Sequence, residues 1–221
     1  MRSWLFHPLI FYPLLALVAA LVTLASLQPQ AWPRKPAPVA GEIHNGMLVL
    51  QGAAFNSPDP DPEQRLNVDR DFWGHPQSLH VAVIANQPPP TPAETGVRIL
   101  LTPQAAQALG AGDVTVEVSY RPQAVNNASS FAVSLQGIGP ADWVTMPVQP
   151  QAGVLHFNLP PGFAPDAIGL RAISTANDEA YGIEITRIVA YPSRTPATPP
   201  PTLAPASSAS STQTSQPAAG H

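Results

Sequence analysis

The sequence lacks cysteine and has few charged residues. Only 11% of its 221 residues are Asp, Glu, Lys or Arg, whereas about a quarter is usual in globular proteins. Without cysteine the chain can form no disulfide bond, no thiolate metal site and no cysteine nucleophile. Cysteine usage therefore says nothing about the redox state of the protein's compartment.

Signatures of catalysis are also missing from the sequence. It contains no G-x-S-x-G nucleophile motif and no glycine-rich phosphate loop. None of the six histidines occurs in an H-x-H or H-E-x-x-H pair. We therefore expect a protein that is not an enzyme and that carries no cofactor and no metal ion.

The charge that is present is distributed unevenly. All 14 acidic residues lie between residues 42 and 191, together with six arginines, and six against 14 gives this part a net charge of −8. The flanking segments contain the other four basic residues. An acidic domain repels a phosphate backbone, so we expect no nucleic-acid partner.

Residues 9–27, LIFYPLLALVAALVTLASL, form a stretch without charge. As a helix it is about 28 Å long, close to the hydrocarbon thickness of roughly 30 Å in a bilayer. Pro8 and Pro13 lie in the opening turns, where a missing N–H costs least. This pattern predicts a single transmembrane helix. The alternative is a cleaved signal peptide with small residues Thr23 and Ala25 before the cleavage site, although such peptides usually have a shorter apolar stretch.

The charges that flank this stretch bear on its orientation in a membrane, but they nearly balance. Arg2 precedes it, and Arg34 and Lys35 follow it, so the positive-inside comparison is nearly balanced. Because a short N-terminus usually stays in the cytoplasm, we expect residues 1–8 to be cytoplasmic and the domain to face the periplasm from the inner membrane. Residues 28–41 are proline-rich and predict an extended spacer. Residues 193–221 are rich in Pro, Ser, Thr and Ala and predict a disordered tail.

Residues 42–192 alternate apolar and polar side chains in short runs, which is typical of strands with one buried face. Ten candidate strands occur, at residues 47–52, 66–70, 79–84, 97–101, 113–120, 131–137, 143–148, 154–159, 168–173 and 181–193. Turns rich in Pro, Gly, Asn and Asp separate them. This spacing predicts a mainly β domain, a two-sheet antiparallel jelly-roll sandwich with one face of each sheet buried and the other wet.

One short helix interrupts the strands. In TPQAAQALG, Thr102 is a suitable N-cap, Pro103 occupies the first helical position and Gly110 follows the last turn. Ala105, Ala106 and Leu109 share its apolar side. Because two turns are too short to be stable alone, we expect this helix to cover one end of the sandwich.

The order of these elements resembles a known family. The passage VRILLTPQAAQALGAGDVTVEVSYRP resembles the strand, short helix and strand of carbohydrate-binding-module-like, galactose-binding-like β-sandwiches, and AIGLRAIS with YGIEITRIVAYP resembles their closing strands. The whole chain resembles uncharacterised membrane-anchored bacterial proteins that carry such a domain. The resemblance covers about residues 47–192 and implies a jelly-roll fold and sugar binding, although fold alone does not imply function.

The last strand contains an arginine out of phase. Ile183 and Ile185 share the apolar face with the position of Arg187, and the apolar phase resumes at Ile188. Either the strand stays regular and Arg187 projects into a concave face, or a β-bulge near Thr186 turns it outward. The cost of burying an unpaired charge favours the bulge.

Two tryptophans are candidates for stacking against sugar rings. Trp73 has Asp71 close by, and Trp143 follows Asp142, so each combines an aromatic face with a hydrogen-bonding group. The alternative for both is packing against the edge of the core, where large aromatic side chains are mostly buried.

The segment SPDPDPEQ places Asp59, Asp61 and Glu63 at alternate positions. Carboxylates are calcium ligands, but the intervening prolines keep the chain extended and prevent it from curling around an ion. A solvated acidic loop is the favoured interpretation.

These patterns favour a non-catalytic, membrane-anchored protein whose β-sandwich is a binding or accessory module outside the cytoplasm. Its expected partners are the lipid bilayer and either a glycan or an envelope protein. The alternatives are specific recognition of an envelope glycan through the Trp73 or Trp143 region and, third, an envelope hydrolase.

Overall fold

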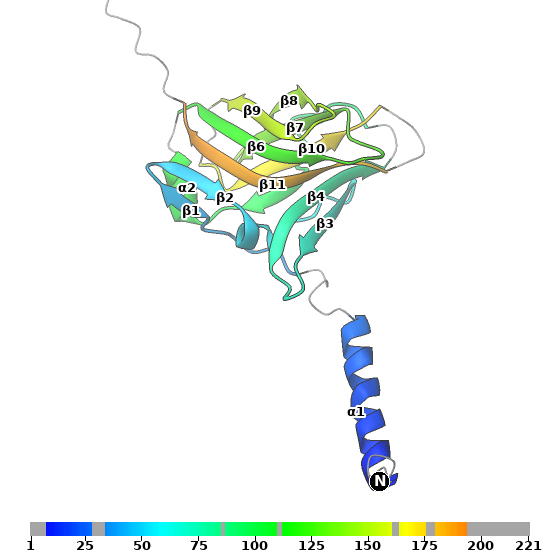
Figure 1. Ribbon diagram of the computed structural model, residues 1–221. Helices are drawn as coiled ribbons and strands as arrows, with labels where there is room; N and C mark the ends of the chain where they lie inside the picture. Colours follow the sequence, from blue (N-terminus) through cyan, green and yellow to red (C-terminus); the bar gives the residue numbers. More distant parts are fainter. Residues whose placement is uncertain are drawn as a thin grey trace, which may run out of the picture.

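The computed structural model describes residues 8–27, 34–84, 87–109, 112–160, 164–175 and 180–193 (Figure 1). The first element in the described part of the chain is the helix α1 (Pro8–Leu27), which covers the stretch predicted to be helical. No helix in the described part of the chain combines the length and the apolarity needed to cross a membrane. The tail predicted at 193–221 lies, apart from Ser193, outside the described residues, as do residues 1–7 and 28–33.

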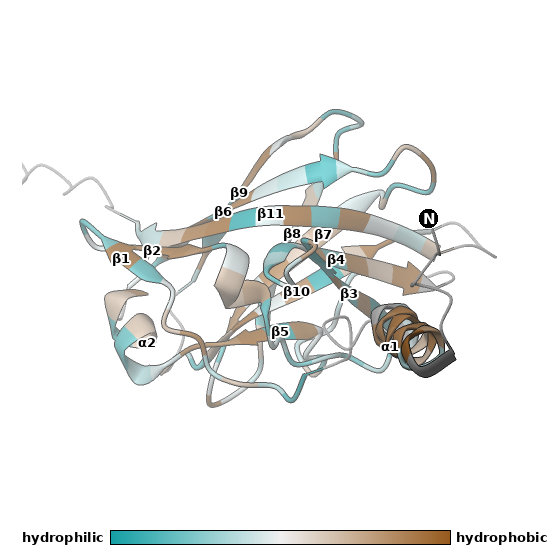
Figure 2. Cartoon of the chain, turned by 60° about the horizontal axis from the view of Figure 1, so that its bottom comes forward, coloured by the Kyte–Doolittle hydropathy of each residue, from teal (hydrophilic) through white to brown (hydrophobic). Residues whose placement is uncertain are grey.

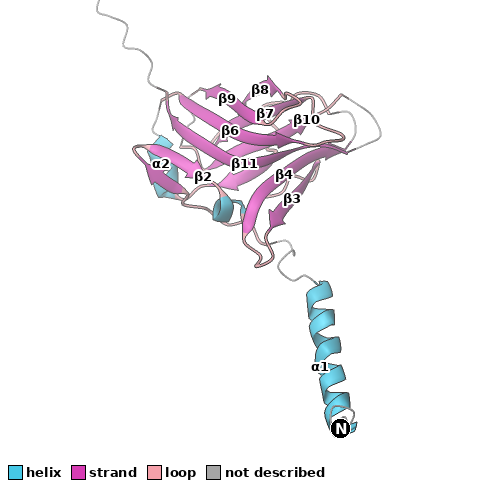
Figure 3. Cartoon of the chain, in the orientation of Figure 1, coloured by secondary structure: helices cyan, strands magenta, loops and turns pink. Residues whose placement is uncertain are grey.

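The larger of two antiparallel sheets has seven strands (Figures 1 and 3). Its long central strand β11 (Ala180–Pro192) pairs along one side with β6, which in turn pairs with β9. Along its other side β11 pairs first with β4 and then with β2, which continue to β3 and β1. The other bounds are β1 (Glu42–His44), β2 (Met47–Leu50), β3 (Gln64–Arg70), β4 (Pro76–Ile84), β6 (Val114–Pro122) and β9 (Gly153–Leu159).

The second sheet has four strands in the order β5 (Val97–Leu100), β10 (Ala167–Ile173), β7 (Ser130–Gln136) and β8 (Asp142–Pro147). The core lies between the two sheets, where alternate residues of both interdigitate. Phe131 of β7 and Phe157 of β9 meet there edge to face, with ring centroids 6.3 Å apart. Burial of such rings is a major part of what holds the layers together.

All ten predicted strands are present, so the predicted mainly β fold of two antiparallel sheets is confirmed. The jelly-roll connectivity is not confirmed. Two elements were missed: the three-residue strand β1 and the 3₁₀ helix η3 (Gly52–Phe55), which buries Phe55. Both are too short to show a periodic signal.

The short helix α2 (Pro103–Leu109) forms where it was predicted. The hydroxyl of Thr102 accepts a hydrogen bond from the Ala105 amide at 3.4 Å, as an N-cap does. Ala105 and Leu109 are buried, and Ala106 is half-buried. The helix contacts β2 and β11, so it covers one end of the sandwich as expected.

The predicted bulge in the last strand is confirmed. The register of β11 against β6 shifts between Ile185, opposite Tyr120, and Arg187, opposite Ser119. Arg187 is exposed and Ile188 is buried, as the bulge requires. The shift falls where β11 changes its neighbour from β4 to β2. Arg187 is therefore a surface residue next to a β-bulge and does not project into the core.

The four-stranded sheet departs from the expectation of one wet face. Every residue of β10 is buried, including those on the side opposite the core residues Ile168 and Leu170. Two segments lie against that outer side, where the carboxylates of residues 61, 63 and 94 pair with Arg171 of β10. The bridges Asp59–Arg98 and Gln87–Ser174 tie the same two segments to the sheet. The expectation was wrong because loops distant in sequence, which leave no mark on the strand's own pattern, cover the face.

Candidate functional site

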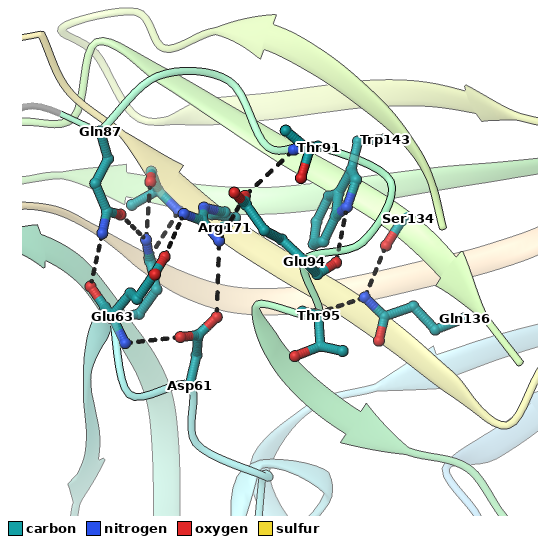
Figure 4. A network of polar contacts seen from close by, with 12 residues as sticks. Asp61, Glu63, Gln87, Thr91, Glu94, Thr95, Ser134, Gln136, Trp143 and Arg171 are labelled. Atoms are coloured by element: carbon teal, nitrogen blue, oxygen red, sulfur yellow. Dashed lines mark hydrogen bonds and ion pairs between the residues drawn. The ribbon is translucent and has the colours of Figure 1, made fainter. Parts of the chain in front are cut away.

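A buried arginine organises the covered face of the four-stranded sheet (Figure 4). Arg171 of β10 is only 2% exposed. Its Nη2 atom lies 2.8 Å from Glu63 Oε2, and its Nη1 atom lies 3.0 Å from Glu94 Oε2 and 3.8 Å from Asp61 Oδ2. Three carboxylates from the two covering segments thus meet one guanidinium. Such pairing is what makes a buried charge tolerable.

Glutamines extend this network toward the backbone. The side chain of Gln64 accepts a hydrogen bond from the Ala172 amide at 3.1 Å and donates to the Ala172 carbonyl at 3.2 Å. It also donates to Gln87 Oε1 at 2.9 Å, while Gln87 Nε2 donates to the Glu63 carbonyl at 3.2 Å. Both covering segments are therefore held to strand β10 by directed bonds.

The interpretation of Asp59, Asp61 and Glu63 as a solvated acidic loop was wrong. Asp61 is 7% exposed and accepts a hydrogen bond from the Glu63 amide at 2.7 Å. Asp59 pairs with Arg98, whose Nε donates to its Oδ2 at 2.9 Å. The three carboxylates neutralise arginines of the sheet. Within the described ranges, no group of three or more His, Asp or Glu side chains is placed to hold a metal ion.

A pocket of about 460 Å³ lies beside this network. Loop 91–95, the turn 137–141 and the ends of β5 and β7 surround it. Its polar side chains are Thr91, Glu94, Thr95, Arg98, Gln136 and Asp166. Residues distant in sequence form it because the Ala141 amide donates to the Pro92 carbonyl at 3.0 Å, which ties the loop to the turn.

Gln136 is the distinctive residue of this pocket. It is 7% exposed, and its Nε2 donates to the Thr95 carbonyl at 2.5 Å and to Ser134 Oγ at 3.1 Å (Figure 4). Its Oε1 is a buried acceptor with no hydrogen-bond partner among the described residues. Gly169 makes room for the amide, since a Cβ there would collide with it. A buried acceptor left without a donor is costly, so a hydrogen-bond donor that reached this oxygen would be favoured.

Trp143 holds the loop from the neighbouring strand β8 (Figure 4). Its indole is half-buried, and Nε1 donates to the Glu94 carbonyl at 3.1 Å. The ring passes close to Gly96, where an added Cβ would lie 2.8 Å from Trp143 Cη2. These contacts give Trp143 a packing role beside the pocket. Asp142, one residue earlier, is exposed.

Trp73 lies elsewhere, in the turn between β3 and β4 of the other sheet. It is 78% exposed, and its neighbour Phe72 is 85% exposed. Both oxygens of Asp71 are used within the turn: Oδ1 accepts from the amides of Trp73 (2.9 Å) and His75 (2.8 Å), and Oδ2 lies 3.1 Å from His75 Nδ1. The hydrogen bond from the His75 amide is the main cause that lowers the pKa of Asp71. The structure therefore does not bring the two tryptophans together, and their role in sugar stacking stays a prediction.

A larger groove, of about 690 Å³, lies where β6 begins and where β9 and β11 end. Most of its polar side chains bond to one another or to neighbours. Thr115 Oγ1 contacts Asn158 Oδ1 at 3.1 Å and Ser193 Oγ at 2.7 Å. The Tyr191 hydroxyl donates to Glu117 at 2.9 Å, which raises the pKa of Tyr191. Because Thr115, Asn158, Ser193 and Tyr191 already have partners, this groove is a weaker candidate than the pocket at Gln136.

Sequence reasoning missed Arg171, Glu94 and Gln136. The one available signal was Arg171 itself, a charge inside the otherwise apolar strand AIGLRAI. Its partners lie in loops, whose place against the sheet depends on tertiary contacts.

Comparison with known proteins finds only weak structural similarity. No protein-family model matches the chain, and no curated protein matches it. One similar solved structure is titled "BiXyn10A CBM1 APO", a carbohydrate-binding module, with 8% identity and a TM-score of 0.41, covering 71% of this chain and 100% of that one. Another is the K1 cleaved adhesin domain of Lys-gingipain from Porphyromonas gingivalis W83, with 11% identity and a TM-score of 0.28, covering 68% of this chain and 93% of that one. At these values the likenesses carry no argument about a ligand.

Proposed function

We propose that this protein is a non-catalytic binding module whose pocket at Gln136 takes a hydroxyl-rich ligand, a segment of an envelope glycan. The observation that carries the proposal is the unpartnered Oε1 of Gln136, a residue that lines a pocket of about 460 Å³. A volume of this size lies within the usual range for small-ligand sites.

The donors and acceptors around the pocket match a sugar. Hydroxyl groups both donate and accept, so one sugar can donate to Gln136 Oε1 and to the exposed carboxylate of Asp166. Arg98 adds a cationic donor, although Asp59 already neutralises it. A strongly anionic ligand would meet Glu94 and Asp166 in the same pocket. The balance favours a neutral glycan.

The carboxylates of the pocket support binding more than hydrolysis. Glycoside hydrolysis normally needs two free carboxyl groups on either side of the scissile bond. Glu94 Oε2 is already shared between Arg171 at 3.0 Å and the Thr91 amide at 3.2 Å. It holds the loop in place and is not available as a free acid or base.

We also propose that α1 tethers this module to a lipid bilayer with the domain in the periplasm. The support is the exposure of large apolar side chains along the described part of the helix, at Phe11, Tyr12, Leu14, Leu15, Leu17, Val18, Leu21, Val22 and Leu24. Side chains of this kind need an apolar surrounding. If the tether is correct, the protein sediments with membranes after alkaline carbonate washing, and alkaline phosphatase fused after Arg194 is active. Release by carbonate would refute it.

Ligand binding is tested with the full chain in detergent against immobilised neutral and acidic envelope polysaccharides. Gln136→Met removes the amide at similar volume and should weaken retention at least tenfold, since a buried hydrogen bond is lost. Trp73→Ala is the control and should leave retention unchanged. Retention that survives Gln136→Met but not Trp73→Ala would move the site to the β3–β4 turn. Release of reducing ends during incubation would instead indicate a hydrolase.

A further inference from the structure

The turn between β3 and β4 presents two large aromatic side chains to solvent. Phe72 and Trp73 are the most exposed aromatic residues in the described part of the chain. Their rings meet edge to face, with centroids 5.2 Å apart and planes at 84°. Exposing two adjacent aromatic rings to water costs free energy and adds nothing to the core of the domain. Such a pair usually marks a contact surface.

The turn holds these rings out rigidly. The Asp71 amide donates to the His75 carbonyl at 2.9 Å, and the Gly74 amide donates to the Asp71 carbonyl at 2.9 Å. Gly74 has a φ of +84°, which favours glycine. With the two further amides bound to the Asp71 carboxylate, the four-residue tip is fixed from within. Little conformational entropy remains to be lost when the rings bind.

Basic residues stand beside this turn. Arg70, at its base, donates to Asn56 Oδ1 at 2.8 Å and to the Gly74 carbonyl at 3.2 Å. Desolvation lowers the pKa of Arg70, and the like charge of Arg34 lowers it further. Arg34 and Lys35, at the start of the segment that leads into the domain, are both exposed. The segment before the domain thus presents two cations, and the turn itself holds Arg70 beside the carboxylates of Asp69 and Asp71.

The position of Arg34 also relates the turn to α1. Six residues separate Leu27, the last of α1, from Arg34, which makes seven Cα–Cα steps. Even fully extended, they span at most about 25 Å. In Figure 1 the turn of β3 and β4 is at the end of the sandwich that faces α1, and Figure 2 brings this end forward. The aromatic turn is thus within short reach of the place where α1 ends.

We propose that Phe72 and Trp73 insert into the interfacial layer of the bilayer that holds α1, while Arg34 and Lys35 contact anionic lipid headgroups. This inference rests on the proposed tether. Trp and other aromatic rings are favoured at the boundary between headgroups and acyl chains. Cations within a Debye length of an anionic leaflet add attraction. The two contacts, α1 and the turn, would fix the domain against the membrane surface at a defined orientation.

The geometry of the turn fits a bilayer better than a sugar. A stacking site needs a flat aromatic face with free hydrogen-bonding groups at its rim, but the two rings are perpendicular and Asp71 is used by its own turn. An interfacial site needs only apolar area and nearby cations. Asp69 is a carboxylate close by, and it is engaged with Ser78 Oγ at 3.3 Å.

The test uses Trp73 as its own probe in the full chain. The variant Trp4→Phe, Trp32→Phe, Trp143→Phe leaves Trp73 as the sole tryptophan of the four in the sequence. The matched control, Trp4→Phe, Trp32→Phe, Trp73→Phe, leaves Trp143. Both are reconstituted in phosphatidylcholine and phosphatidylglycerol vesicles that contain lipids brominated near the headgroup end of the acyl chain.

We expect blue-shifted Trp73 emission, quenched severalfold by the brominated lipid, and Trp143 emission that the brominated lipid leaves unchanged. Exchanging phosphatidylglycerol for phosphatidylcholine should reduce the quenching of Trp73. Water-like, unquenched Trp73 emission from protein that floats with the vesicles would overturn the inference and leave the tether standing. Protein that fails to float would overturn both. A Trp73 signal insensitive to lipid but changed by envelope oligosaccharides would favour sugar stacking instead.

Discussion

Arg171 on β10 lies 3.0 Å from Glu94 in the loop before β5 and 2.8 Å from Glu63 in the segment before β3. These ion pairs join one strand to two loops that are remote from it in sequence. Through Glu94, which lines the pocket, they hold one of its loops against strand β10. The stability of the domain and the shape of the pocket are therefore coupled at this residue.

Arg171→Met should be strongly destabilising. It removes the cation and leaves the buried carboxylate of Asp61 without its partner, a situation that costs about 3–5 kcal/mol. Arg187→Met is the matched control, because Arg187 is exposed at the bulge and its loss should change the free energy of unfolding by less than about 0.5 kcal/mol. Urea denaturation of both variants measures the difference. Equal midpoints would show that the network contributes nothing.

Gly96→Ala should displace the loop over the sheet. Gly96 has a φ of +60°, and an added Cβ would lie 2.8 Å from both the Leu170 carbonyl oxygen and Trp143 Cη2. Gly46, with a φ of +77° and no atom within 4 Å of such a Cβ, is the control. Gly46→Ala should cost about 1–2 kcal/mol from the left-handed backbone alone.

Gly96→Ala should cost at least twice as much as Gly46→Ala, because either the loop or Trp143 must move as well. Thermal unfolding gives the comparison, and the same samples show whether glycan retention falls. If the two variants unfold at similar temperatures, the loop is not packed against the sheet as described.

The sequence was sufficient to predict those elements of the fold that depend on the local pattern of residues. Strand positions follow from the period-2 alternation, and the helix at Pro103–Leu109 follows from its N-cap and apolar side. Even the bulge was predictable, because a regular strand would have placed Arg187 in the core.

What the sequence could not predict depends on contacts between distant segments. The covering of β10 by loops involves residues whose own neighbours look like ordinary turns. The unpaired oxygen of Gln136 is defined only by the groups around it in space. The sequence also does not show that the Asp71 carboxylate accepts hydrogen bonds from amides of its own turn, because this depends on the conformation of the turn.

Deleting Thr186 should be tolerated. Thr186 is the extra residue of the bulge, since Ile185 and Arg187 lie opposite consecutive residues of β6. Its removal would leave Ile185 and Ile188 on the core side with one residue between them, a regular strand. The expected loss is about 1 kcal/mol, from the hydrogen bond of Thr186 Oγ1 to the Ser119 carbonyl.

Deleting Glu117, in the regular part of β6, is the comparison for Thr186. This deletion would turn the side chains on one side of the deleted residue to the opposite face of the sheet. It should prevent folding or lower the free energy of unfolding several times more than the Thr186 deletion does. Circular dichroism and urea denaturation of the two deletions decide the matter. A Thr186 deletion as damaging as the Glu117 deletion would contradict the assignment of the bulge.

The rigidity of the β3–β4 turn should depend on pH through Asp71. Because the folded-state pKa of Asp71 is lowered, chiefly by the His75 amide, its ionised form stabilises the turn. That contribution is complete above about pH 4, the ordinary range of an aspartate, and is lost as the pH falls through the lowered value. Protection of the Trp73 and His75 amides against hydrogen exchange should therefore decrease in acid.

Asp71 variants separate the charge from the hydrogen-bond acceptor. Asp71→Ala should remove the protection of both amides at neutral pH, since both donate to Oδ1. Asp71→Asn keeps an acceptor oxygen but cannot ionise, so its protection should be intermediate and constant with pH. Asp69→Ala, whose side chain bonds to Ser78, should leave both amides protected. Amide protection of the native turn that stays flat with pH would show that the carboxylate charge does not hold the aromatic pair in place.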